Sequence, residues 1–461
     1  EHLTEALQFT RQVGSWMLRL GLSGDAERLA SLSKAAASAA LPQEGPLGRA
    51  GVQLLLGQAE QALAGGQVTT ALNMLSVLES RIAPEKGLSY GGEEALADRG
   101  VILHRLGQCL LAVGQPAEAR KRLTGAVELL RQCQPSEQLR RELASGWGRL
   151  GDARLAEEQL DEAAIAYERG LELGRVLEDR RLSGLMQVGL ATVAIKRNDD
   201  ASASAQLHAA LEDLAAANDH QGMVDPWQRL ALLALRNGDV AQAETAFQEA
   251  VGAAQRASDA PLEVQALIEL GHLMEVQSRL DEARGTYQRA VDAARGSRRA
   301  PLVLKAEQAL ARVLLASGAV QEAKEHAMEA QALADNLGPQ ASPWQVYQLL
   351  GRIAQAEGNA EREAHWRLAA QESYAASPEA VALVLQWKPL SQAVLEACRG
   401  GSLDLGAVEA LERLESDPMW GALAGAIWRI LEGERGTETY ADLDLSQAAV
   451  ARHIVAELQK G

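Results

Sequence analysis

Four arginines recur at related positions along the chain, and their side chains could bind anions. Arg149 and Arg229 each precede a leucine by one residue, whereas Arg312 and Arg352 each follow a leucine by two residues. Positions three residues apart share one face of a helix. A guanidinium group binds a carboxylate or a phosphate through two parallel hydrogen bonds. The spacing therefore predicts a row of anion-binding groups on one face of successive helices.

Residues that could catalyse a reaction do not form any recognisable motif. The sequence has no G-x-x-x-x-G-K-[ST] phosphate loop, no G-x-S-x-G nucleophile elbow, no H-E-x-x-H motif and no paired C-x-x-C. The eight histidines are dispersed, and acidic pairs such as Asp199 and Asp200 are typical of helix caps and solvated faces. We therefore expect no catalytic residue, no cofactor and no metal site.

The cysteines and the apolar runs indicate the cellular compartment of the chain. Cys109, Cys133 and Cys398 are odd in number and far apart, so they predict neither a disulfide framework nor a metal-ligand set, and a reducing compartment follows. No apolar run approaches the roughly 20 residues of a membrane span, and the N-terminus has no signal core. We expect a cytoplasmic chain without a membrane partner. Because the sequence begins with Glu1 rather than Met, we also expect a piece of a longer protein or a processed product.

The composition indicates an all-helical protein. Aromatic residues make up 3% of the chain, whereas Ala and Leu are abundant and Val and Ile are sparse. Strands favour β-branched and aromatic residues, and helices favour Ala, Leu, Glu, Gln and Arg. The net charge of −17 argues against a nucleic-acid partner, because binding to a duplex requires a clustered basic face.

A pattern built on a Leu-Gly or Leu-Ala pair returns about every 40 residues. Five copies align without gaps, and each has a small residue 12 and 19 positions after the Gly or Ala. Their pairs lie at 106–107, 150–151, 230–231, 270–271 and 310–311, and weaker copies begin at 56–57, 188–189 and 350–351. Small residues allow two helices to approach closely where they cross. Between copies, Gly238 can end one helix and Asp239 can cap the next. Each copy therefore predicts a helical hairpin that must stack on its neighbours to bury its apolar face.

These residues resemble the tetratricopeptide repeat. Trp147, Leu150, Gly151, Ala163 and Tyr167 match its W-x2-L-G and A-x3-F/Y pattern. The resemblance covers residues 45–374, with the family's period of about 34 residues extended to about 40. It implies an all-α fold, an α-solenoid in which hairpins stack into a right-handed superhelix. Relatives with extended helices bind peptides or partner proteins.

The resemblance also implies that the first helix of each hairpin lines a concave groove. The candidate groove residues share one face of these helices; they are His104, Arg149, Asp152, Gln187, Gln228, Arg229, His272, Gln308, Arg312, Gln348 and Arg352. Such a groove would bind an acidic peptide segment or a C-terminal carboxylate. The alternative is that its arginines form ion pairs with Glu and Asp inside the solenoid. The Lys and Asn set of the family's carboxylate clamp is absent, so that particular specificity does not carry over.

We divide the chain into three parts. Residues 1–44 form an N-terminal hairpin, residues 45–376 an array of about eight repeats, and residues 377–461 a helical cap over the last apolar face. The loop at 83–95 is either a binding loop or a plain surface insertion. The phrase AIWRILEGERG, which begins at Ala426, is similar to tails that follow repeat arrays in large bacterial sensor and defence proteins. That likeness implies a bacterial protein with an effector domain before this piece.

Together these features predict a non-catalytic scaffold or sensor region that binds a protein or a peptide, without any cofactor. The alternative is a module that self-associates through its tryptophan-containing tail and regulates an attached effector. The sequence leaves the oligomeric state open.

Overall fold

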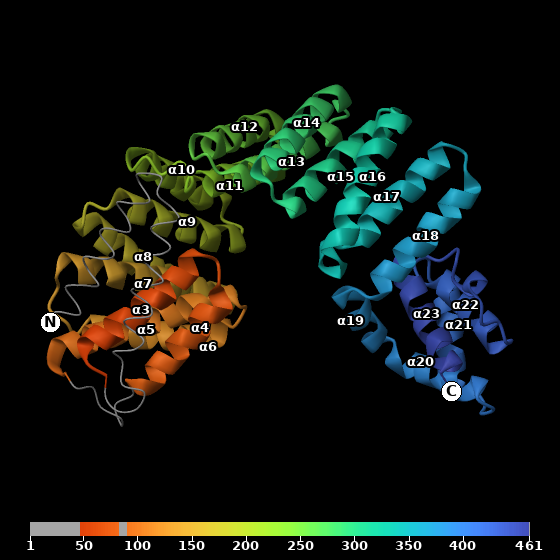
Figure 1. The fold of residues 1–461 in the computed structure, drawn as a ribbon, viewed down its shortest axis with the longest axis horizontal. Coiled ribbons are helices and arrows are strands. Elements are labelled where there is room, and N and C mark those ends of the chain that lie inside the picture. The colour runs from red at the N-terminus through yellow and green to blue at the C-terminus, as the bar shows by residue number, and fades with distance from the viewer. Residues whose placement is uncertain (1–46, 83–89, 461) are drawn as a thin grey trace. The chain divides into compact units, whose positions relative to one another are not determined.

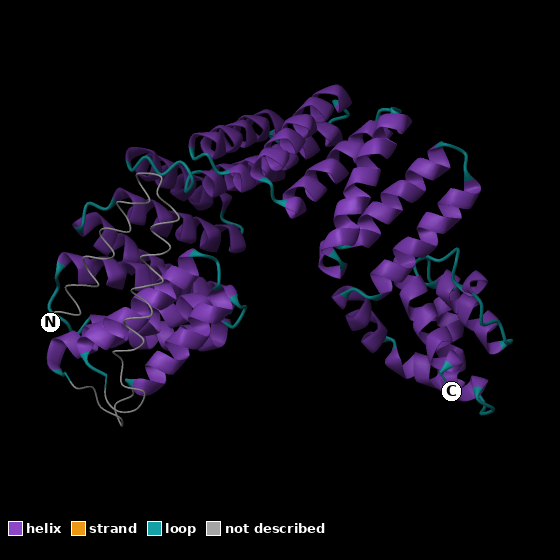
Figure 2. Cartoon of the chain, viewed as in Figure 1, coloured by secondary structure: helices purple, strands orange, loops and turns teal. Residues whose placement is uncertain are grey.

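The computed structural model describes residues 47–82 and 90–460, and Figures 1 and 2 show their fold. Within these ranges the chain forms 21 α-helices, two short 3-10 helices and no strand, which confirms the all-α fold class. The predicted N-terminal hairpin at 1–44 lies outside the described residues. The chain divides into two compact units, residues 1–243 and 244–461, with the boundary inside helix α12 (Val240–Arg256).

The first unit consists of successive antiparallel hairpins. Its complete helices are α3 (Arg49–Ala64), α4 (Val68–Arg81), α5 (Gly92–Ala112), α6 (Pro116–Leu130), α7 (Glu137–Ala156), α8 (Leu160–Val176), α9 (Arg180–Lys196), α10 (Asp200–Ala216) and α11 (Val224–Arg236). The most extensive contacts join α5 with α6, α7 with α8, and α9 with α10, and each pair also packs on the next. Of the loop predicted at 83–95, residues 92–95 belong to α5, and residues 83–89 lie outside the described residues.

The second unit continues the hairpins and then changes to shorter helices. Its long helices are α13 (Ala260–Val276), α14 (Leu280–Ser297), α15 (Ala300–Ala316), α16 (Val320–Leu337), α17 (Pro343–Ala356) and α18 (Ala360–Ala375). The shorter helices are α19 (Pro378–Gln386), α20 (Lys388–Cys398), α21 (Leu405–Glu415), α22 (Gly421–Leu431) and α23 (Leu445–Gln459), and the 3-10 helices are η1 (Pro339–Ala341) and η2 (Thr437–Thr439).

Left-handed backbone residues mark the helix ends at a regular interval. They recur every 20 residues, at Glu158, Glu178, Asn198, Asn218, Gly238, Ser258, Ser278, Arg298, Gly318, Gly338 and Gly358. The predicted stop at Gly238 is confirmed, since its φ is 76°. The Asp239 carboxylate then accepts a hydrogen bond of 2.9 Å from the Gln242 amide, as an N-cap does. Two of these 20-residue intervals, one for each helix of a hairpin, give the 40-residue period of the sequence.

Glycines allow the helices to pack closely against a buried tyrosine. Tyr167 on α8 is only 2% exposed, and its ring lies between Gly151 on α7 and Gly189 on α9. A Cβ atom placed on Gly151 would lie 2.6 Å from the Tyr167 ring, and one on Gly189 would be equally crowded. Small residues at these positions are therefore required by the helix spacing, as the repeat pattern predicts.

Helices α19–α23 form a second kind of core at the C-terminal end of the chain. Buried residues on α22 and α23, among them Leu423, Ile427, Ile430, Val450 and Ile454, pack into one apolar cluster. Helix α23 also packs on α18, the last helix of the hairpin series. The C-terminal region thus covers the end of that series, while the three-part division of the chain stays a prediction. Among the helices of the described ranges, none is both long and apolar enough to cross a membrane.

Candidate functional site

Two of the candidate groove residues, His104 and Gln187, are buried in the described part of the chain. His104 is only 1% exposed, and its Nδ1 lies 3.0 Å from Glu142 Oε2 and 2.9 Å from Arg105 Nη1. Burial lowers the pKa of His104 and favours the neutral imidazole. Gln187 is 5% exposed and lies within the helix packing. Both side chains belong to the core of the first unit.

Three of the four arginines form ion pairs within the hairpins. Arg149 contacts Asp152 at 3.0 Å and Arg229 contacts Asp225 at 2.7 Å, and in each pair both residues lie on the same helix. Arg312 contacts Glu275 on α13 at 2.8 Å. For these three side chains the geometry matches the alternative that the sequence left open, in which the arginines pair with acidic residues of the chain itself.

The Arg312 pair is part of a fixed network. Arg312 Nη2 also donates to the Tyr287 hydroxyl at 3.0 Å, and that hydroxyl donates to Glu275 Oε2 at 3.0 Å. Burial raises the pKa of Tyr287, and the Glu275 carboxylate adds to this effect against the opposing charge of Arg312. The phenol therefore stays protonated, and Arg312 on α15 is held in place by both helices of the preceding hairpin, α13 and α14.

The remaining candidates keep free polar groups. His272, Gln348 and Arg352 are exposed. The amide nitrogens of Gln228 and Gln308 are shielded from solvent and have no hydrogen-bond partner among residues 47–82 and 90–460. A buried donor without a partner loses its hydration without compensation. Such donors are available to a ligand that brings an acceptor.

The structure brings four of the candidates together in one groove of about 800 Å³ in the second unit. Helix α15 contributes Gln308 and Arg312, helix α17 contributes Gln348 and Arg352, and helix α18 and the start of α23 complete the walls. The groove is lined by three arginines, namely Arg312, Arg352 and Arg367. Among these described residues, only Arg352 has no carboxylate partner, since Arg367 contacts Glu363 at 2.7 Å and Asp442 at 3.2 Å.

One wall of this groove is fixed by Gln371 on α18. Its side chain is fully buried, and Nε2 donates to the backbone oxygens of Tyr440 at 3.1 Å and of Leu443 at 2.8 Å. Its Oε1 atom has no partner in the described chain. Gln371 therefore attaches the segment before α23 to the hairpin series and leaves one acceptor at the groove wall.

Sequence reasoning missed the part of the groove that the C-terminal region supplies. Arg367, Gln371 and Asp442 lie outside the Leu-Gly pattern, and Asp442 is 75 residues from the arginine that it contacts. No periodic signal could have placed this segment against α18, because its position depends on the packing of α23.

Comparisons with known proteins found one family match and several similar solved structures. Residues 224–296, which span α11 to α14, match the family model of the tetratricopeptide repeat. No curated protein matches the chain in sequence. A signal transduction ATPase with numerous domains from Pyrococcus horikoshii, which has a tetratricopeptide repeat sensor, is 17% identical with a TM-score of 0.49. The match covers 72% of this chain and 48% of that protein.

Two bacterial structures are similar over more of their own length. The quorum sensor NprR from B. thuringiensis, in its apo form, is 12% identical with a TM-score of 0.46, and the match covers 80% of this chain and 99% of that one. Aspartyl phosphate phosphatase F from Bacillus subtilis is 10% identical with a TM-score of 0.42, over 70% of this chain and 93% of that one.

Proposed function

We propose that this chain, which carries tetratricopeptide repeats, is a non-catalytic scaffold or sensor region that binds a protein or a peptide. Stacked helical hairpins suit this role because they present long surfaces to a partner. The proposed site is the groove between α15, α17, α18 and the start of α23. Its preferred ligand is an extended segment with an acidic side chain or a free C-terminal carboxylate.

One observation carries this proposal. Arg352 is exposed in a groove whose other two arginines already form ion pairs with carboxylates of the chain. Its guanidinium group can therefore bind a carboxylate of a partner. The unpaired Gln308 amide nitrogen and the exposed Gln348 side chain lie on the same walls. Amide groups of this kind can pair with the backbone of an extended peptide.

The test is a binding screen against a library of extended peptides with acidic, neutral or basic side chains and with free or amidated C-termini. We expect acidic or free-carboxylate peptides to bind the full chain, and Arg352→Glu to weaken their binding by at least about 10-fold, as loss of one charge-assisted pair does. Arg289→Glu is the matched control, because Arg289 is exposed on α14 outside the groove. Equal weakening by both variants, or binding independent of the carboxylate, would refute the proposal.

Self-association is the second candidate, and exposed apolar residues in the C-terminal region favour it. Val381 and Leu385, one turn apart on α19, are 53% and 62% exposed, and Met419 is 67% exposed. The tail tryptophans themselves are partly covered, since the rings of Trp387 and Trp420 lie 4.7 Å apart. Light scattering on the full chain and on Val381→Ser/Leu385→Ser tests this candidate: an oligomer that becomes a folded monomer supports it, and an unchanged mass contradicts it.

A further inference from the structure

One hairpin departs from the repeat pattern at two core positions that face each other. Four residues before the Gly or Ala of each pair, the other ungapped copies have Leu103, Trp147, Trp227 or Leu267, whereas the copy at 310–311 has Glu307. Fifteen residues after the Gly or Ala, three of the other four copies have the buried small residues Ala166, Ala246 and Thr286 and the fourth has Arg122, whereas this copy has His326. A bulky apolar residue and a small residue are thus replaced by a carboxylate and an imidazole.

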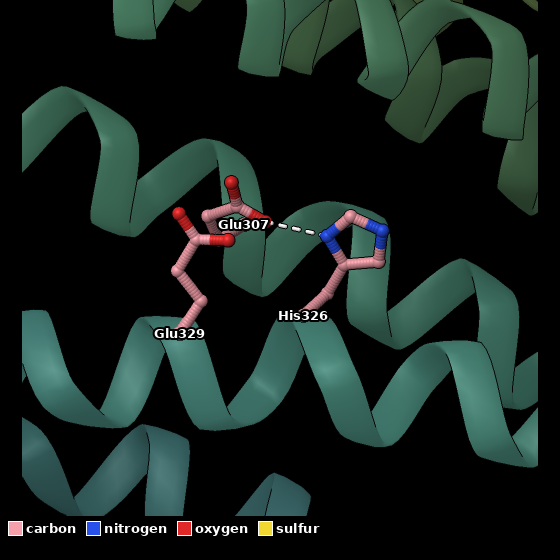
Figure 3. A group of neighbouring side chains, drawn as sticks. All are labelled: Glu307, His326 and Glu329. Atoms are coloured by element: carbon pink, nitrogen blue, oxygen red, sulfur yellow. Dashed lines mark hydrogen bonds and ion pairs between the residues drawn. The ribbon is translucent and has the colours of Figure 1, made fainter.

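These two side chains meet a third candidate ligand, the Glu329 carboxylate, in the folded protein. Glu307 on α15 is fully buried, and its Oε2 lies 2.6 Å from His326 Nδ1 on α16. Glu329 lies one turn after His326 on the same helix, and Figure 3 shows both pointing toward Glu307. One ligand atom from each residue lies within 4.8 Å of the other two. Two carboxylates and an imidazole therefore converge from two helices.

A cation already lies between the two carboxylates. Arg295, at the last turn of α14, places Nη2 2.8 Å from Glu307 Oε1 and 2.6 Å from Glu329 Oε2. The Arg295 side chain is 46% exposed, as is that of Glu329, so both reach the cluster from its solvent side. Arg295 can therefore move away without disturbing the core, and the same side is open to an entering ion and its water ligands.

Stability alone does not account for this cluster. A buried ion pair stabilises a fold no better than well-packed apolar residues of the same volume, and often less well. The neighbouring copies show that the same position accepts Leu267, which is fully buried. A local departure from an otherwise consistent core is expected at functional sites.

We propose that Glu307, His326 and Glu329 form a binding site for a divalent transition-metal ion, with Zn²⁺ as the ion that fits best. Imidazole and carboxylate ligands suit Zn²⁺, and three protein ligands leave a coordination position for water. Ligand atoms about 2.1 Å from a tetrahedral zinc lie roughly 3.4 Å apart. A rotation of the half-exposed Glu329 side chain would set its own ligand atom at that spacing, and Glu307 and His326, whose facing atoms lie 2.6 Å apart, would separate as the ion enters between them. The ion would take the place of the Arg295 guanidinium and would link α15 to α16.

The test is calorimetric titration of Zn²⁺ into the full chain after treatment with a chelator, with Mg²⁺ as a comparison ion. We expect one strong zinc site, which His326→Ala or Glu329→Gln weakens by at least about 10-fold. Glu325→Gln, an exposed carboxylate on the same helix, is the matched control and should leave that site intact. Arg295→Gln should shift the site to tighter binding, because it removes the competing cation.

A double variant keeps the inference falsifiable if a single change at the buried Glu307 unfolds the hairpin. Glu307→Leu/His326→Ala introduces residue types that other copies already have at these positions, Leu267 at the first and Ala166 or Ala246 at the second, so it should fold and lose the strong site. No strong zinc site in the full chain would overturn the inference, and so would a strong site that persists in the double variant. An Arg295→Gln variant that fails to bind zinc more tightly would also contradict it, because the arginine would then not occupy the site of the ion.

Discussion

Replacement of Gly151 by alanine tests whether glycine is required where the helices cross. Gly151 lies inside α7, and the methyl group of alanine would sit 2.6 to 2.8 Å from three atoms of the Tyr167 ring. The ring cannot move away, because Gly189 on α9 contacts it closely from another helix. The matched control is Gly285→Ala, inside α14, where an added Cβ atom meets nothing within 4 Å.

The expected magnitude follows from two opposing effects. Alanine in a helix interior is favoured over glycine by about 1 kcal/mol, and this gain applies at both positions. At Gly151 the overpacking against Tyr167 costs about 1–3 kcal/mol in addition. The control should therefore be stabilised by up to about 1 kcal/mol, and the free energy of unfolding of the two variants should differ by about 1–3 kcal/mol.

Urea unfolding of the full-length variants, followed by far-ultraviolet circular dichroism, measures this difference. Gly151→Ala should unfold at the same or a lower urea concentration than the wild type, and Gly285→Ala at the same or a higher concentration, with Gly151→Ala below Gly285→Ala. Stabilisation of the Gly151→Ala variant equal to that of the control would refute the reasoning, because it would mean that the two helices can separate without cost.

Two further predictions concern buried polar contacts. Glu142→Gln should lower the free energy of unfolding at neutral pH, and this effect should disappear in acid. Burial alone would raise the pKa of Glu142, but hydrogen bonds from His104 and Arg105 hold that pKa at about 2. A carboxyl group whose pKa is lowered by folding stabilises the fold at pH values above its unfolded pKa. In urea titrations the greater stability of the wild type should therefore vanish as the pH falls from about 4.5 to about 2. A difference between the two proteins that does not depend on pH would contradict this. Gln371→Leu should lower the free energy of unfolding by about 1–3 kcal/mol, because the buried Tyr440 and Leu443 carbonyls lose their donor; an unchanged urea midpoint would show that water replaces it.

The hairpins could be predicted from the sequence because their determinants are local. The Leu-Gly pairs, the small residues that follow them and the turn at Gly238 and Asp239 all act within one repeat, so spacing alone identifies them. The same reasoning named His104 and Gln187 as groove candidates, yet both side chains are buried. Periodicity identifies a helical face, but only the neighbouring hairpin decides whether that face stays open.

Whether an arginine is free or paired could not be read from the same pattern. Arg312 and Arg352 occupy the same register position, yet Arg312 contacts Glu275, which is 37 residues away, and Arg352 has no such partner among the described residues. Arg149 and Arg229 find their partners on their own helices, at spacings that the sequence allows but does not require.

By itself the sequence determined that this chain builds stacked helical hairpins, because the helix period and the small residues at the crossings are properties of neighbouring positions. Only the tertiary structure decided which polar groups remain available and where they meet. The groove beside Arg352 and the cluster at Glu307 each combine residues from separate helices. The distance between such residues depends on how the hairpins pack, which no local pattern encodes.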